Sequence, residues 1–424
     1  MKTEANDLLS FFLSSSLLKS IPRTGWVWEG IENPETIAEH CFRVTFFAWV
    51  LGAKANLQQS RLLPMALTHE LCEIHAGDMT PYFDILPEDE EEKQKVLQRW
   101  VRLSQKKKEI LSRKKFDLEK KALDRVLDPL SPLLQERLLS LWMEYEKGSS
   151  LEGKFVKQID RVEALLQGIE YLGPKPDSIL VGWWEGTEEI VDHPILRAFL
   201  KTIEHRLYEN KASDMDGELA FLMEVGKLKR RPRRGWVIRD VQNPETMANH
   251  TFSHALMAWI LSWEAEIVLN RDRILKMCLL RLLCHSRLEE ESPFDNLLRK
   301  AKTQEERRHI LGKWIRSSSR EKRVRNEKRY LEEEKTLRQI IAPLDSLLQE
   351  EMLSCKKEYG ENKTSEARFT NQAYVLEILL RAFQYAEEDT NFDIKPWWEW
   401  ASESIDNSVF AKLMNAMDKR FAKT

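Results

Sequence analysis

The sequence predicts an all-α protein in which one helical domain occurs twice. The chain has 424 residues, which is more than a single hydrophobic core usually organises. A long segment of the first half returns in the second half, and such internal similarity is the signature of a duplicated fold. Apolar residues follow helical spacing in both halves, and strand-like alternation never persists for more than a few residues.

The repeat is clearest in a run that returns without a gap. The run that starts at Arg23 reads RTGWVWEGIENPETIAEH, and the run that starts at Arg233 reads RRGWVIRDVQNPETMANH, 210 residues later. The triplet WWE at Trp183 is echoed by the triplet WWE at Trp397, 214 residues later. The two copies therefore stay close to register over most of their length.

The domain boundary is expected between the copies, near Ser213. Residues 207–217 read LYENKASDMDG, which is polar and lacks a periodic apolar stripe. Such a run suits a short linker. We therefore expect a first domain over residues 1–212 and a second over residues 213–424.

Helix signals fill each copy. In the first copy, the start cue Asn33-Pro-Glu precedes long apolar runs from Thr36 to Leu51 that no turn residue interrupts. The charged stretches 88–121 and 299–338 have sparse apolar residues near helical spacing. We interpret them as solvated helix faces with ion pairs between residues four apart, in preference to a nucleic-acid arm.

The composition excludes several classes of protein. The 66 basic and 69 acidic side chains give a formal charge of −3, so no global field favours nucleic acid or an anionic membrane. The five cysteines lack paired short spacing and mostly sit in apolar helical patterns, which fits a reducing compartment. The first residues resemble neither a signal peptide nor a membrane span. We expect a cytoplasmic protein that binds neither nucleic acid nor membrane.

Acidic and histidine side chains in the first copy suggest a metal site. His69, Glu70 and Glu73 fall within one predicted helix, where residues four apart share a face. His40 ends an earlier Glu-His pair, and Asp160 sits among apolar helical positions where an unpaired carboxylate is costly to bury. A single helical histidine is more often an ordinary packed or surface group, so the prediction rests on the set.

The first copy resembles the HD-domain 5'-deoxynucleotidases over residues 8 to about 205. The resemblance is carried by PRTGW from Pro22, NPETIAEH from Asn33 and HELCE from His69 with its following Gly-Asp pair, and then by LWMEYE from Leu141 and FVKQID from Phe155. In that family a His, a His-Asp pair and a distant Asp hold one catalytic divalent metal. The resemblance implies an all-helical fold, a homodimer, and removal of phosphate from deoxyribonucleoside 5'-monophosphates.

By position, the resemblance also implies roles for individual residues. It implies one divalent metal ion (Mn, Co or Mg), a proton-handling group for the attacking water or the leaving oxygen, a carboxylate supporting the same pocket, and contacts to phosphate and to sugar or base. The implied residues are His40, His69, Glu70 and Asp160 for the metal, Glu73 and Asp78 for the acid–base pocket, and Arg23 and Trp26 for the substrate. The family has Asp where this chain has Glu70, and the extra methylene displaces the carboxylate by more than a bond length.

The second copy has lost both acidic ligands. At the matching positions it keeps His250 and His285, has Glu289 for Glu73, and replaces the acids by Ser286 and Tyr374. Two imidazoles without an anionic partner hold a hard divalent ion weakly, and a phenol is a poor ligand at neutral pH. We expect a site in this copy without metal and without catalysis.

Three functions of different classes follow from these observations. The first is a metal-dependent phosphohydrolase acting on nucleotides in the first copy alone. The second is a nucleotide-binding or scaffolding protein that kept the fold and lost turnover, as the Glu70 departure suggests. The third is nucleic-acid binding by the basic run 320–329, which is weaker because Glu327 and the acids at 332–334 interrupt the charge.

The duplication predicts a monomer in solution. Because the family works as a homodimer, the two copies would reproduce that dimer within one chain, with a large apolar interface between residues 1–208 and 217–424. Light scattering should then return the mass of one chain at all concentrations. A mass of two chains, or two domains that do not touch, would contradict this pseudo-dimer.

Overall fold

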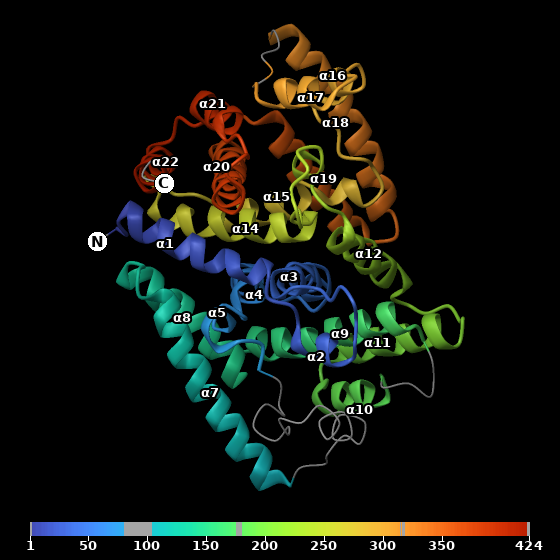
Figure 1. Cartoon of the computed structure of the whole chain (residues 1–424). Helices are drawn as coiled ribbons and strands as arrows, with labels where there is room; N and C mark the ends of the chain where they lie inside the picture. The colour runs from blue at the N-terminus through green and yellow to red at the C-terminus, as the bar shows by residue number, and fades with distance from the viewer. Residues whose placement is uncertain (1, 80–103, 175–179, 314, 316–318, 422–424) are drawn as a thin grey trace. The chain divides into compact units, whose positions relative to one another are not determined.

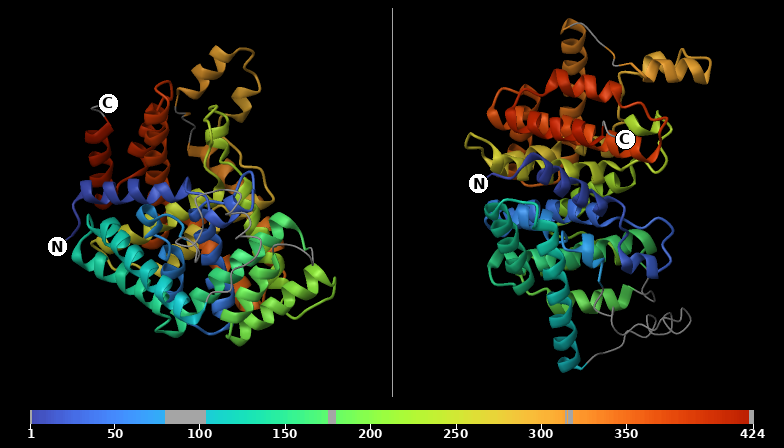
Figure 2. Two further views of the ribbon diagram at one scale, coloured as in Figure 1. Left: turned by 60° about the horizontal axis from the view of Figure 1, so that its bottom comes forward. Right: turned by 60° about the vertical axis from the view of Figure 1, so that its left-hand side comes forward.

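The computed structural model describes residues 2–79, 104–174, 180–313, 315 and 319–421. Within these ranges the chain forms helices and turns and no strand, so the predicted all-α class is confirmed (Figures 1 and 2). None of the helices within these ranges has the length and apolarity that a membrane crossing needs. Contacts divide the chain into one unit of Ser10–Leu222 and another of Lys2–Leu9 with Met223–Thr424.

The first unit is a bundle around one fully buried helix. Its elements are α1 (Ala5–Ser15, which begins before the unit), η1 (Ser16–Lys19), α2 (Thr24–Trp28), α3 (Ile37–Lys54), α4 (Gln59–Thr68), α5 (Glu73–Ala76), α7 (Gln105–Leu127), α8 (Pro132–Lys147), α9 (Leu151–Leu172), α10 (Leu180–Ile190), α11 (Pro194–Ile203) and η2 (Glu204–Tyr208). Helix α3 packs against α4 and α9, and α8 packs against α4, α7 and α9.

Helix α3 starts where the sequence predicts a helix. Thr36 accepts a hydrogen bond from the backbone N–H of Glu39, and the Glu39 side chain accepts one from the backbone N–H of Thr36. This capping box satisfies two donors that a helix start leaves without partners. Every residue of α3 from Ile37 to Gly52 is buried, so its polar side chains must find partners on neighbouring helices.

The second unit repeats the long helices of the first in the same order. Its elements are α12 (Asp216–Gly226, which begins before the unit), η3 (Lys227–Arg230), α13 (Arg234–Val237), α14 (Met247–Glu264), α15 (Arg271–Leu280), η4 (Leu283–Ser286), α16 (Asp295–Leu298), α17 (Gln304–Leu311), α18 (Ser319–Ile341), α19 (Ser346–Glu361), α20 (Ser365–Glu388), α21 (Lys395–Ser404) and α22 (Ser408–Phe421). Here η4 takes the place of α5, and the two short helices α16 and α17 have no counterpart among the described elements of the first unit. Helix α14 matches α3 and packs against α15 and α20 as α3 packs against α4 and α9.

Backbone details repeat as well as helices. An isolated antiparallel bridge joins Pro22 to Thr36 in the first unit, and another joins Pro232 to Thr246 in the second. Both bridges fasten the Gly-Trp segment to the start of the long buried helix. The repeated run therefore has a structural role in both units.

A buried ion-pair network joins α3 to α9. Arg43 is 0% exposed, and its guanidinium donates from Nε to Glu163 Oε1 at 2.6 Å, from Nη1 to Glu170 Oε2 at 2.7 Å and from Nη2 to Gln167 Oε1 at 2.9 Å. The arginine thus satisfies three acceptors on successive turns of α9. It fixes how α3 lies along that helix.

Substitution of Arg43 should therefore destabilise the first unit strongly. Arg43→Met leaves Glu163 buried without its guanidinium, and such a loss costs about 3–5 kcal/mol. Arg61→Met is the matched control, because Arg61 also pairs with a glutamate, Glu144, but its side chain is 44% exposed; its loss should cost about 0–1 kcal/mol. Denaturant unfolding followed by circular dichroism measures both. Equal effects of the two substitutions would contradict a structural role of the buried network.

Candidate metal centre

His40 is held between two carboxylates of α9. Its ring is 0% exposed, and Nε2 lies 3.1 Å from Asp160 Oδ1 while Nδ1 lies 2.5 Å from Glu163 Oε2. Burial and the Arg23 charge lower the pKa of His40, but the two carboxylates outweigh them and raise it to about 9. A histidine whose second nitrogen is fixed by a carboxylate is the usual form of a metal-ligating histidine.

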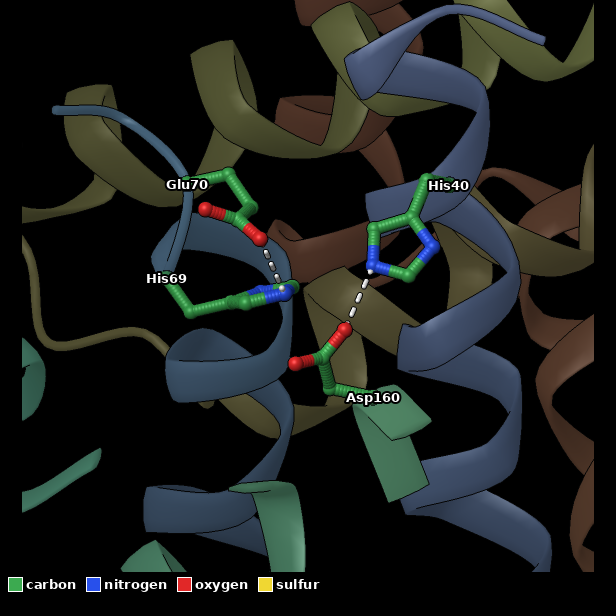
Figure 3. A group of neighbouring side chains, drawn as sticks. All are labelled: His40, His69, Glu70 and Asp160. Carbon is green, nitrogen blue, oxygen red and sulfur yellow. Dashed lines mark hydrogen bonds and ion pairs between the residues drawn. The ribbon is translucent and has the colours of Figure 1, made fainter. Parts of the chain in front are cut away.

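His69 and Glu70 come from the place where α4 ends. The sequence predicts one helix carrying His69 and Glu73 on a shared face, and this is wrong, because α4 ends at Thr68 and α5 begins only at Glu73. In the turn between them, the N–H of Glu73 donates to the carbonyl of Glu70 at 3.1 Å, three residues back rather than four. The tightened turn lets two adjacent side chains face the same point (Figure 3).

The Nε2 atom of His69 is the one available to a metal ion. Its Nδ1 lies 2.9 Å from the carbonyl oxygen of Ala66, which fixes the ring, and burial lowers the pKa of this histidine. Its Nε2 is buried and makes no hydrogen bond within the described residues. A neutral imidazole so fixed presents a lone pair on Nε2, as a metal ligand requires.

Four predicted ligands converge. One donor atom from each of His40, His69, Glu70 and Asp160 lies within 4.8 Å of the others, and all four residues are buried. Donors bound to one cation at about 2.1 Å lie at most about 4.2 Å apart, so small movements would bring this set around a single ion. Two imidazole nitrogens and two carboxylate oxygens suit a divalent metal ion. The residues present therefore fit one divalent metal.

Arg23 lies beside these donors, between two acids. Its Nη1 is 3.2 Å from Glu70 Oε1 and 3.7 Å from Asp78 Oδ1. Asp78 also accepts the backbone N–H of Thr24 at 2.6 Å, so it fixes the segment that carries the arginine. Burial opposes ionisation of Glu70, but His69 and Arg23 hold its pKa low.

Glu73 lies behind Glu70 in the same buried region. It is 2% exposed, and its carboxyl is close enough to that of Glu70 for the two groups to shift each other's pKa. Burial first, and then the charges of Asp78 and Glu70, raise the pKa of Glu73 well above the ordinary value. The pKa values of the two neighbouring carboxyls are therefore shifted in opposite directions.

Trp26 lies in the core. It is 1% exposed, its indole N–H donates to Glu35 Oε1 at 2.9 Å, and its ring stacks on Trp183 at a centroid distance of 4.7 Å. The second unit repeats the bond from Trp236 to Glu245 at 3.0 Å. This tryptophan therefore packs the fold, and a contact between it and sugar or base stays a prediction.

Two residues that contact the predicted ligands were not predicted from the sequence. Glu163 orients His40, and the hydroxyl of Tyr145 donates to Asp160 Oδ2 at 3.1 Å. One signal was available, since both residues recur in the second copy, as Glu377 and Tyr359. Their direction toward the site follows from helix packing, which the sequence alone does not give.

One charged residue of the stretch 88–121, which we interpret from the sequence as a solvated helix face, is buried. Residues 88–103 lie outside the described residues. On α7, however, Lys115 Nζ lies 2.9 Å from Glu119 Oε1, and Glu119 is only 2% exposed. Burial raises the pKa of Glu119 to about 7 despite the lysine, and the charges of Glu70 and Glu73 help to raise that of Lys115. The ion pair four residues apart is therefore as expected, but its glutamate is buried while the lysine is 31% exposed.

The comparisons with known proteins agree with this geometry. The sequence pattern of the HD domain matches residues 16–183, 225–312 and 317–412, which include most of both copies. The chain belongs to the HD domain family. The match in both halves also confirms that the HD domain occurs here in tandem.

The curated relatives of this HD domain protein are named as nucleotidases. The human 5'-deoxynucleotidase HDDC2 is 30% identical over 211 residues, covering 49% of this chain and 90% of the human protein. The Bos taurus protein of the same name is 31% identical, covering 47% and 85%. The 5'-deoxynucleotidase hdd1 of Schizosaccharomyces pombe is 30% identical, covering 46% and 88%.

The second HD domain builds a different centre on the same scaffold. His250 Nδ1 lies 2.5 Å from Glu377 Oε2, as His40 lies beside Glu163. Tyr374 stands at the position of Asp160, and its hydroxyl accepts a hydrogen bond from Arg233 Nη2 at 2.8 Å. Glu290 accepts hydrogen bonds from the Arg233 side chain and from the backbone N–H of Arg234. In the first unit Asp78 makes the corresponding contacts with Arg23 and with the backbone N–H of Thr24. An arginine and a tyrosine thus meet where the first unit has its carboxylates.

Loss of the carboxylate behind His40 should weaken metal binding. Glu163→Gln keeps the size of the side chain but removes the charge that holds the imidazole, and such changes cost about 10- to 100-fold in metal affinity. Calorimetric titration with Mn²⁺ measures this without any assay of activity. Glu170→Gln is the control, because Glu170 bonds the same Arg43 but not His40. A similar weakening in both variants would show that only the arginine network matters.

Proposed function

We propose that the first HD domain is a metal-dependent phosphohydrolase that removes phosphate from deoxyribonucleoside 5'-monophosphates. One observation carries the proposal, which is the convergence of His40, His69, Glu70 and Asp160 within 4.8 Å. The names of the relatives, 5'-deoxynucleotidases at about 30% identity, supply the substrate class. When bound, a divalent ion would polarise the phosphoryl group and lower the pKa of a water molecule.

The side chains around the four metal-binding residues would bind the phosphate, transfer a proton and orient a ligand. Arg23 would bind a phosphate oxygen, because its planar guanidinium matches phosphate geometry and Asp78 fixes its segment. Glu73, buried beside Glu70 and with a raised pKa, would move a proton between the attacking water and the leaving oxygen. Tyr145 would keep Asp160 turned toward the centre through its bond to Oδ2.

A second function is favoured by one specific contact. Arg23 Nη1 lies 3.2 Å from the Glu70 oxygen that also lies 3.6 Å from His69 Nε2. The longer side chain of glutamate thus lets one oxygen serve both the arginine and the centre. This contact competes with phosphate for the arginine, so the alternative is an HD domain that binds metal and nucleotide with weak turnover or none.

Phosphate release from a panel of nucleoside monophosphates with Mn²⁺, Co²⁺ or Mg²⁺ tests the proposal. Asp160→Ala should lower kcat/KM by about 100-fold or more, because it removes a ligand. Glu70→Asp should raise turnover, because the shorter acid releases Arg23. Metal binding by the wild type without any phosphate release would select the alternative function.

A matched pair of variants assigns the activity to one copy. Glu73→Gln should abolish most of the turnover, whereas Glu289→Gln, at the corresponding position of the second copy, should leave it unchanged. Glu289 is 90% exposed in its side chain and lies on the surface. Equal losses in the two variants would refute the assignment to the first domain.

A further inference from the structure

The second domain buries polar groups that have no partner within the described residues. They lie on three side chains that are at least nine-tenths buried and on one that is partly exposed. The atoms are Arg233 Nη1, His250 Nε2, His285 Nδ1 and Arg281 Nε. Unpartnered groups of this kind are rare in folded proteins, and a cluster of them indicates a ligand or ordered water.

The groups gather around one aromatic ring. Tyr374 has the Arg281 guanidinium 4.7 Å and the Arg233 guanidinium 5.6 Å from its ring centroid, and the His250 ring lies 5.1 Å away. The Tyr374 hydroxyl is bonded to Arg233 Nη2, which leaves Nη1 of the same guanidinium for another acceptor. Burial, helped by the nearby charges of Arg281 and Arg233, lowers the pKa of His285 to about 4.

The charges of this cluster are the reverse of those in the first domain. Ser286 and Tyr374 replace the two acidic ligands, and Arg281 replaces Met65, a residue that is 0% exposed. The acids that remain each have a partner. Glu290 bonds Arg233 at 2.9 Å, and Glu333 pairs with Lys356 at 2.5 Å. Glu245 and Glu377 both contact His250 Nδ1, at 3.1 and 2.5 Å, which leaves its Nε2 without a partner within the described residues. Where the first domain has two carboxylates, the second therefore has a serine and a phenol, with two guanidinium groups beside the phenol ring.

We propose that the second domain binds a phosphoryl oxyanion without metal, at Arg233, Arg281 and His250 around the ring of Tyr374. Guanidinium groups offer planar pairs of N–H donors that match the spacing of phosphate oxygens, whereas two imidazoles without a carboxylate ligand would hold a divalent ion weakly. The ligand class is a phosphate monoester or free phosphate. Such binding is independent of turnover in the first domain.

Calorimetric titration of the full chain, treated with EDTA, tests this site. Inorganic phosphate, a deoxynucleoside 5'-monophosphate and the matching deoxynucleoside are the three probes. Phosphate and the monophosphate should each bind with one site per chain, and the nucleoside should not. Tighter binding of the monophosphate identifies a nucleotide ligand, and equal binding identifies phosphate itself.

Variants assign the binding to the second domain. Arg281→Met places there the residue that the first domain has, and it should weaken phosphate binding at least tenfold while cooperative thermal unfolding is kept. Arg281→Lys keeps the charge but loses the paired donors, and it should weaken binding as well, which covers the case in which the methionine variant does not fold. Asp160→Asn should leave binding unchanged. No saturable binding of phosphate, or binding that is lost only in Asp160→Asn, would overturn the proposal.

Discussion

The first domain depends on a chain of buried charges that crosses from α3 to α9. Arg43 and His40 lie one turn apart on α3, and Glu163 accepts a hydrogen bond from both of them. Charged groups are costly to bury unless each finds a partner, so this shared carboxylate sets both the packing of the two helices and the orientation of the imidazole. The centre is therefore built into the core of the domain rather than added at its surface.

The second domain shows which parts of that chain the scaffold needs. It keeps the histidine–glutamate pair as His250 and Glu377, but it has Ser253 where the first domain has Arg43. An arginine of α20, Arg381, lies with its guanidinium 3.9 Å from the ring centroid of Tyr385 and donates to Gln384, both on its own helix. The contact between His250 and Glu377 is thus kept in the second domain without an arginine at the position of Arg43.

The sequence predicted what local signals and the repeat could predict. The capping residue Thr36, the helix after it and the meeting of His40 with Asp160 all follow from patterns or from the family resemblance. The end of α4 at Thr68 was missed, because the apolar run continues through the break and no glycine marks it. The burial of Glu119 was missed as well, since a helix rich in charge gives no sign of the one turn that faces inward.

The bond from the indole of Trp26 to Glu35 and its repeat between Trp236 and Glu245 have a consequence for how relatives are recognised. The tryptophan and glutamate of the repeated run hold a loop against a helix in both units, also where the acidic residues at the centre are absent. A sequence motif built on these two residues therefore identifies the fold and not the activity. The difference between the two halves lies at positions 70 and 160 in one and 286 and 374 in the other, where carboxylates are replaced by a serine and a tyrosine.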